Sequence, residues 1–190
     1  MDRYAAFLRG INISGKNKIA MPALKAGFED LGFSDVVTYL NSGNVLFSDQ
    51  DREEGTITNL IETMIHEKFG FLIPVHVVRV DSLRDILEHA PGWWGTEEKE
   101  KYHNLIFVLS PAMAEDICRQ IGEPTKELEK ISVYRNVIFW TFERKEYSKC
   151  NWWKKTAGAG IGEKLTIRTA NTVKICFSKG IHCVSYGENS

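Results

Sequence analysis

Apolar residues at the start of the chain follow first the spacing of a strand and then the spacing of a helix. Residues 3–9 form an apolar run between two arginines, which is typical of a strand buried on both faces. From Met21 to Leu31 apolar residues recur every three or four positions, with Pro22 near the start and Gly32 in the C-terminal capping position. The pattern predicts a central strand followed by a helix that ends before Gly32.

Two strands, a second helix and a fourth strand are predicted next. Residues 36–47 contain two β-prone runs joined by residues 41–44, whose Asn and Gly readily adopt the positive φ of a tight hairpin. Apolar residues then repeat at helical spacing over residues 57–69, and residues 75–80 form another β-prone run. This β-α-β-β-α-β order is the ferredoxin-like arrangement, in which two helices cover one face of an antiparallel sheet. The other face is left for water, a ligand or a second domain.

A change in composition marks a boundary after this unit. A short helix at residues 82–89 leads into residues 91–95, which contain Pro, Gly and two Trp and are typical of a linker or protruding loop. We therefore predict a ferredoxin-like subdomain at residues 1–81 and a second α+β subdomain at residues 82–190. The fold class is α+β.

The second half repeats the order of the first only in part. Its predicted elements are a strand at 104–109, a helix at 112–121, hairpin strands at 131–134 and 137–142, and helices at 147–155 and 170–177, with a closing strand also allowed at 182–186. The order begins β-α-β-β and then turns into a basic helical C-terminal part.

Charge is distributed unevenly along a chain of ordinary globular composition. The hydrophobic share is 43%, the charged share is 26% and the net charge is -1, which excludes a disordered polyelectrolyte. Residues 144–190, however, carry nine Lys/Arg and three Asp/Glu, a balance of +6. This asymmetry favours a surface for nucleic acid or another polyanion, although a solvated helix face gives the same count.

Targeting signals, disulfides and metal motifs are absent from the sequence pattern. The first residues lack the apolar stretch of a signal peptide and no segment reaches membrane-spanning length, so a cytoplasmic location without membrane partners is expected. The cysteines, at positions 118, 150, 176 and 183, form no C-x-x-C pair and are expected to be buried and reduced. The five histidines show no ligand spacing, so neither a metal nor a cofactor is predicted.

The loop after the first strand contains a phosphate-binding pattern that fails at its last position. Residues 10–16 fit the first seven positions of G-x-x-x-x-G-K-[ST], but Asn17 replaces the hydroxyl that would hold magnesium. The antiparallel order also conflicts with P-loop enzymes. Two interpretations stay open: the loop amides bind a phosphate or carboxylate beside Arg9, Lys16 and Lys18, or Asn12 merely satisfies the backbone of a compact turn.

Three further positions or clusters have both a functional and a structural interpretation. Ser42 lies in the predicted hairpin turn and has no G-x-S-x-G context, which argues against a nucleophile. Residues 145–155 combine lysines with Tyr and two Trp. In a nucleic-acid site the lysines would pair with phosphates and the bases would stack on the indoles, whereas in the structural interpretation the aromatic residues anchor a helix. Arg168 and Asn171 lie where the chain is expected to enter the last helix, so Thr169 or Asn171 caps the helix and Arg168 could reach an anion.

Three motifs resemble the bacterial domain-of-unknown-function family numbered sixteen ninety-seven. The family pattern R-G-I-N-V-G-G is matched at residues 9–15, with Ser14 in place of the frequent first Gly, and basic residues and M-x-x-L follow at residues 16–24. G-F-x-x-V-x-T-Y-x-x-S-G-N-V-x-F is matched at residues 32–47, and T-x-R-x-x-N-T at residues 166–172. The resemblance implies a ferredoxin-like first half and an α+β second half. It carries no established activity, so no catalytic residue is transferred.

The motif positions define one candidate anion site if they meet in an interdomain cleft. Its residues are Arg9, Asn12, Lys16, Lys18, Ser42, Asn44, Arg168 and Asn171. We therefore expect a non-catalytic binding module for nucleic acid or a phosphorylated ligand. The alternative is an enzyme that acts on a small phosphorylated or carboxylated metabolite in that cleft. A third class, a protein-interaction domain that uses Trp93 and Trp94, requires a large exposed apolar patch.

Overall fold

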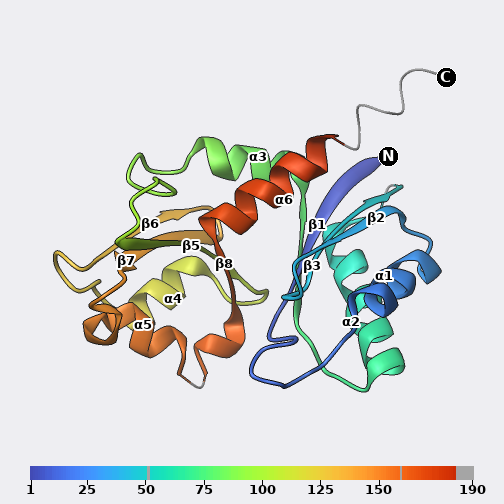
Figure 1. Cartoon of the computed structure of the whole chain (residues 1–190), viewed down its shortest axis with the longest axis horizontal. Coiled ribbons are helices and arrows are strands. Elements are labelled where there is room, and N and C mark those ends of the chain that lie inside the picture. Colours follow the sequence, from blue (N-terminus) through green and yellow to red (C-terminus); the bar gives the residue numbers. More distant parts are fainter. Residues whose placement is uncertain (51, 159, 183–190) are drawn as a thin grey trace. The chain divides into compact units, whose positions relative to one another are not determined.

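The computed structural model describes residues 1–50, 52–158 and 160–182 and divides the chain into two units (Figure 1). Unit 1 comprises Met1–Asp85 together with the chain from Lys174 onward, and unit 2 comprises Ile86–Val173. The chain from Lys174 onward thus groups with the first unit, whereas the sequence analysis assigned it to the second.

Unit 1 has the predicted β-α-β-β-α-β order. Its elements are β1 (Asp2–Leu8), α1 (Met21–Asp30), β2 (Ser34–Tyr39), β3 (Asn44–Asp49), α2 (Glu54–Phe69) and β4 (Val75–Arg79). The strands form an antiparallel sheet in the order β2-β3-β1-β4, with α1 and α2 on one face (Figure 1). The predicted fold class and the ferredoxin-like first half are confirmed.

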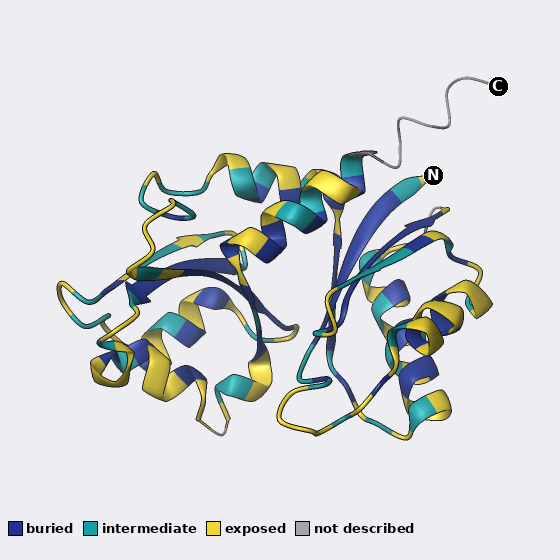
Figure 2. Ribbon diagram, viewed as in Figure 1, coloured by how far each residue is buried: buried dark blue, intermediate teal, exposed yellow. Residues whose placement is uncertain are grey.

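The core of unit 1 lies between its sheet and these two helices. Tyr4, Ala6 and Leu8 of β1 are fully buried there with Phe28 of α1 and Phe47 of β3. Figure 2 shows the corresponding alternation of buried and exposed positions along both helices. Because successive strand residues point to opposite faces, packing against the helices explains the burial of every second residue of β1.

The opposite face of this sheet is also buried. Ala5 and Phe7 of β1 and Leu46 of β3 are each no more than 1% exposed. Hence β1 reads as a continuous apolar run because both of its faces are covered.

Unit 2 contains a second sheet with the same order of strands. Its elements, with the helices that join it to unit 1, are α3 (Val80–Glu88), β5 (Lys101–Val108), α4 (Ala114–Ile121), β6 (Glu129–Tyr134), β7 (Val137–Glu143), the 3-10 turn η1 (Tyr147–Lys149), α5 (Asn151–Thr156), the 3-10 turn η2 (Gly162–Lys164), β8 (Leu165–Thr169) and α6 (Ala170–His182). The sheet order is β6-β7-β5-β8, all antiparallel. The second unit therefore completes the β-α-β-β-α-β order, with α4 and α5 on one face (Figure 1).

The strand that completes this order was missed in the sequence. Residues 166–169 were expected to lead into the last helix, but β8 pairs with β5 from Leu165, opposite Val108, to Thr169, opposite Asn104. β8 runs directly into α6, just as β4 runs directly into α3. Since no turn residue separates the strand from the helix, the sequence contains no signal that marks where β8 ends and α6 begins.

The basic helix predicted at residues 147–155 is broken in two. Cys150 has an extended backbone (φ -70°, ψ 128°) between η1 and α5. The buried carboxylate of Glu129 accepts hydrogen bonds from the Trp152 amide at 3.1 and 3.2 Å. This carboxylate fixes the amino end of α5, so the helix begins after Cys150.

The last helix begins as predicted and extends further. The Thr172 amide donates to Thr169 Oγ1 at 3.2 Å, so Thr169 caps α6. Near its other end, within unit 1, Lys179 lies 5.9 Å from the centre of the Tyr39 ring. The closing strand allowed at residues 182–186 lies outside the described residues, apart from His182 at the end of α6.

Candidate functional site

The loop from Arg9 to Ala20 is held by the side chain of Asn12. Asn12 Nδ2 donates to Ile19 O (2.8 Å) and to Asn41 O (2.9 Å), and the Ile19 amide donates to Asn12 Oδ1 (2.9 Å). The backbone of Asn12 has a φ of 53°, a conformation that Asn tolerates better than most residues. Asn12 therefore ties the loop to the β2–β3 turn, as the structural interpretation of this residue proposed.

The residue that breaks the P-loop pattern also has a structural contact. Asn17 Nδ2 donates to Gly10 O at 3.0 Å, and the Asn12 amide donates to Asn17 O at 3.2 Å. The Lys16 amide donates to Ile13 O at 2.9 Å in a small bridge. These contacts close residues 10–17 into a compact loop.

The β2–β3 turn is built against β1. Gly43 has a φ of 77°, and a Cβ at this position would lie 2.7 Å from Leu8 Cβ, which explains why the turn requires glycine. The buried Asn44 side chain donates to Tyr39 O (2.9 Å) and to Ser42 Oγ (3.1 Å). The contact between Asn44 and Ser42 is a turn contact.

An open pocket lies at the amino end of α1, beside this loop. Its volume is about 630 Å³, and it is lined by Asn12, Gly15, Lys18, Ile19, Ala20, Met21 and Asn41. Ala20 at the N-cap offers no side-chain hydrogen bond, and no acidic residue occurs in the first turn of this fully described helix. Within the described part of the chain, the backbone amides of Met21 and Ala23 donate no hydrogen bond. Such amides carry partial positive charge and favour an anion.

The predicted site residues do not all belong to this pocket. In unit 1, Asn12 and Lys18 line it, whereas Ser42 and Asn44 support the neighbouring turn. Arg9 is half-buried, with its amide donating to Pro74 O at 2.9 Å, and Lys16 is exposed. Of the six predicted residues in unit 1, two line this pocket, together with backbone positions that a side-chain motif could not reveal.

The two predicted residues of the last motif belong to unit 2. Arg168 is 9% exposed, and its Nη1 donates to Thr166 Oγ1 (3.1 Å) and to Ile167 O (2.9 Å). Asn171 is exposed in the first turn of α6. Both of these hydrogen bonds are local to β8.

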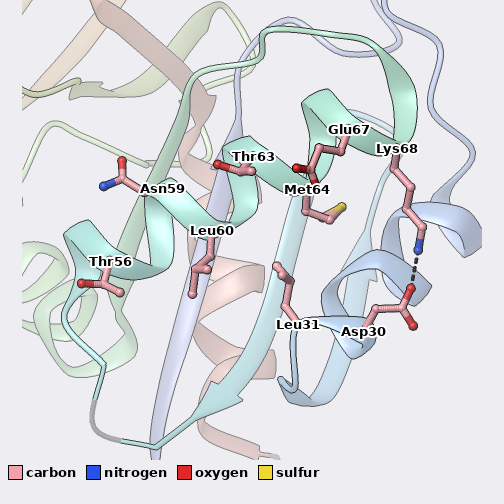
Figure 3. Close-up of a pocket in the computed structure, with 9 residues that line it drawn as sticks. All are labelled: Asp30, Leu31, Thr56, Asn59, Leu60, Thr63, Met64, Glu67 and Lys68. Atoms are coloured by element: carbon pink, nitrogen blue, oxygen red, sulfur yellow. Dashed lines mark hydrogen bonds and ion pairs between the residues drawn. The ribbon is translucent and has the colours of Figure 1, made fainter.

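A second pocket has a different chemistry. It lies between the end of α1 and α2, has a volume of about 610 Å³, and has Leu31, Leu60 and Met64 among its lining residues (Figure 3). At one end Lys68 pairs with Asp30, so the cation nearest this pocket is already neutralised. With three apolar side chains in its lining and its lysine already paired, this pocket is better suited to apolar contact than to an anion.

Thiol and metal chemistry find little support in the described residues. Burial and the neighbouring Glu129 carboxylate raise the pKa of the Cys150 thiol to about 11, and burial raises the pKa of Cys118. Cys150 and Cys176 are buried, as predicted, and Cys118 is partly buried, while Cys183 lies outside the described residues. Within the described ranges no group of three His, Cys, Asp or Glu could hold a metal ion. None of the described helices is long and apolar enough to cross a bilayer.

Comparison with known proteins identifies the family. A family model described as "Protein of unknown function (DUF1697)" matches residues 1–139, which include the loop and the β2–β3 turn. The chain belongs to the DUF1697 family. This confirms the family predicted from the motifs, although the motif at residues 166–172 lies beyond the matched range.

A solved structure has an architecture similar to that of this DUF1697 chain. The conserved bacterial protein SP0830 from Streptococcus pneumoniae superposes with a TM-score of 0.81 and is 25% identical, covering 93% of this chain and 97% of that one. A search of curated proteins finds no match. These similarities establish family and fold; the activity has to be argued from the site.

Proposed function

We propose that unit 1 binds a phosphorylated ligand at the amino end of α1. The observation that carries this proposal is the uncapped first turn of α1, which opens into a pocket lined by Lys18 and by no acidic side chain. Backbone amides at a helix start and a nearby ammonium group are a common combination for phosphate recognition. The pocket volume lies within the roughly 300–1,000 Å³ that ligand pockets usually have.

The nearby contacts support binding more than catalysis. Ser42 Oγ accepts a hydrogen bond from Asn44 Nδ2, and the amide of Asn12 is engaged in holding the loop. A nucleophile needs an adjacent base that activates it, and the pocket lining contains no His, Asp or Glu that could do so. A pocket lined by one lysine, beside the amides of Met21 and Ala23, fits a non-catalytic binding module.

The test is a titration with inorganic phosphate and small phosphate monoesters, followed by amide chemical shifts in ¹⁵N-labelled protein. We expect the largest shifts at Met21 and Ala23, because their N–H groups face the proposed ligand, and an increase in thermal stability. Lys18→Ala should weaken binding about 5-fold to 10-fold, the usual effect of one exposed charged hydrogen bond.

Lys25→Ala is the matched control. Lys25 is exposed on the same helix and pairs with Glu29 at 3.7 Å, away from the pocket lining. Its substitution should leave the phosphate titration unchanged. Equal effects of the two variants would mean that phosphate is attracted by overall positive charge and not by this pocket. Absence of shifts at Met21 and Ala23 would refute the proposal.

A further inference from the structure

A connected group of aromatic rings reaches the surface at one end of the sheet of unit 2. Tyr102 of β5 and Phe142 of β7 are paired in register, with ring centres 5.3 Å apart. Trp153 of α5 lies 5.4 Å from Phe142, and Tyr147 lies 5.0 Å from Trp153. Phe142 is buried, but Tyr102, Trp153 and Tyr147 remain 38%, 41% and 45% exposed. Three adjoining rings are therefore accessible to solvent.

These exposed rings are not needed to anchor α5. Trp152 does that, because its side chain is fully buried and its Nε1 donates to Gly122 O at 3.0 Å. The buried Glu129 carboxylate holds the Trp152 amide as well. The sequence allowed one anchoring role for all the aromatics of this segment, whereas the structure assigns that role to Trp152 and leaves Trp153 and Tyr147 at the surface.

Two of the exposed rings, Tyr147 and Trp153, lie within a strongly basic stretch of the chain. Residues 144–155 carry five Lys/Arg and one Glu. The Arg144 guanidinium lies 4.4 Å from the centre of the Tyr102 ring, and Lys154 is exposed beside Trp153.

Two of the lysines have acidic partners, but these pairs are exposed. Lys145 lies 3.3 Å from Glu100 and Lys149 lies 2.5 Å from Glu146. Exposed pairs of this kind are weak, so a polyanion can exchange with the carboxylates. The surface can therefore offer positive charge to phosphates next to its exposed rings.

We propose that this aromatic–basic surface binds single-stranded nucleic acid. It is defined by Tyr102, Arg144, Tyr147, Lys149, Trp153 and Lys154. Unpaired bases stack on the exposed rings while the backbone phosphates contact the cations, a combination that works with any base sequence. A duplex keeps its bases stacked internally and cannot use the rings. This site lies wholly in unit 2 and is independent of the phosphate pocket proposed in unit 1.

The experiment measures fluorescence anisotropy of labelled single-stranded and duplex oligonucleotides with the full chain at several salt concentrations. We expect the single strand to bind more tightly than the duplex. Trp153→Ala should weaken single-strand binding by roughly 10-fold, the usual effect of losing one base stack. Trp153→Phe, which keeps a flat ring, should retain most of the affinity. Thermal melting of each variant shows whether it is folded.

Lysine variants separate a specific surface from general charge. Lys149→Ala should reduce the slope of log affinity against log salt by about 0.7, the value for one phosphate contact with a single strand. Lys130→Ala, an exposed lysine on β6, is the matched control and should not change affinity. Absence of binding at low salt overturns the proposal and leaves the surface to a protein partner. Equal binding of duplex and single strand, unaffected by Trp153→Ala, also overturns it.

Discussion

The first helix of each unit follows an equivalent strand in sheets of the same order, yet the two amino ends differ. In unit 2, Asn136 Oδ1 accepts a hydrogen bond from the Ala114 amide at 2.7 Å, and Glu115 and Asp116 occupy the first turn of α4. In unit 1, α1 has neither a side-chain cap at Ala20 nor an acidic residue in its first turn. In unit 2, therefore, the amino end of α4 is hydrogen-bonded by a side chain and neutralised by acidic residues, whereas in unit 1 the amino end of α1 is open to an anion.

In each unit an asparagine side chain connects the loop after the first strand to the turn between the second and third strands. The asparagine lies in the turn in unit 2 and in the loop in unit 1, and this produces the difference. Asn136 lies in the β6–β7 turn, and its Nδ2 donates to Val108 O (3.3 Å), at the end of β5, and to Ala112 O (3.2 Å), in the loop that follows. Asn12 lies in the loop after β1 and reaches the β2–β3 turn at Asn41. Asn12 Oδ1 accepts from the Ile19 amide, before α1 begins, so no side-chain oxygen reaches the helix itself.

The largest expected effect comes from removing these two side chains. Asn136→Ala should lower the free energy of unfolding by about 3 kcal/mol, since three hydrogen bonds at ~1 kcal/mol each are lost. Asn12→Ala should cost about 2 kcal/mol, because its contact with Asn41 is exposed and water can replace it. Urea denaturation measures both values. A loss below about 1 kcal/mol for Asn136→Ala would mean that water substitutes in the loop of unit 2 as well.

The sequence predicted those elements whose pattern of apolar residues is visible within a short stretch of chain. Spacing of apolar residues correctly gave the elements of unit 1 and the hairpin at residues 131–142, because buried faces impose periods of 2 and 3.6. It missed β8, where strand and helix adjoin without a turn residue. The counterpart junction of β4 and α3 was the available clue, since the predicted strand at 75–80 was also followed closely by a helix.

The candidate site was less predictable because its chemistry is partly in the backbone. Lys18 and Asn12 could be named from the loop motif, but the free amides of Met21 and Ala23 depend on where α1 begins and on what caps it. Ser42 and Asn44 were plausible site residues, and their contact with each other depends on turn geometry. Likewise, only tertiary packing separates the buried Trp152 from the exposed Trp153 next to it.

The next prediction compares how the fourth strands of the two sheets contribute to the pH dependence of stability. His76 of β4 lies opposite Phe7, and Thr166 of β8 lies opposite Phe107, so the two positions correspond. Burial lowers the pKa of His76 from 6.5 to about 4. Below pH 6.5 the unfolded chain takes up a proton that folded His76 refuses, so stability falls as the pH drops toward 4.

We expect His76 to cost up to about 2 kcal/mol between pH 7 and pH 5. His76→Thr, which installs the residue of the other unit, should remove this part of the pH dependence while leaving the contribution of the carboxylates. Unfolding free energies of both proteins at the two pH values provide the measurement. Parallel pH profiles would show that His76 takes up its proton over the same pH range in the folded protein as in the unfolded chain.

A smaller effect is expected from two buried tryptophans on the helix side of unit 2. Trp152 Nε1 donates to Gly122 O, whereas Trp140 Nε1 is buried with no hydrogen-bond partner among the described residues. Replacement by Phe removes the same volume at both positions, but only Trp152→Phe leaves a carbonyl without its donor. Trp152→Phe should therefore be less stable than Trp140→Phe by about 1–2 kcal/mol in urea denaturation. Equal losses would indicate that a water molecule serves Trp140.

The smallest expected change in stability gives the first turn of α1 the acidic character of α4. Ala23 is exposed, and Ala23→Glu places a carboxylate beside the free amides and Lys18. The favourable interaction with the helix dipole should add about 0.5 kcal/mol to the free energy of unfolding. The same carboxylate should compete with phosphate and weaken its binding. Ala26→Glu, exposed on the next turn, is the control and should change neither quantity appreciably. If Ala23→Glu stabilises the helix but leaves phosphate binding intact, the ligand does not bind at the amino end of α1, and the contrast between the two units concerns stability alone.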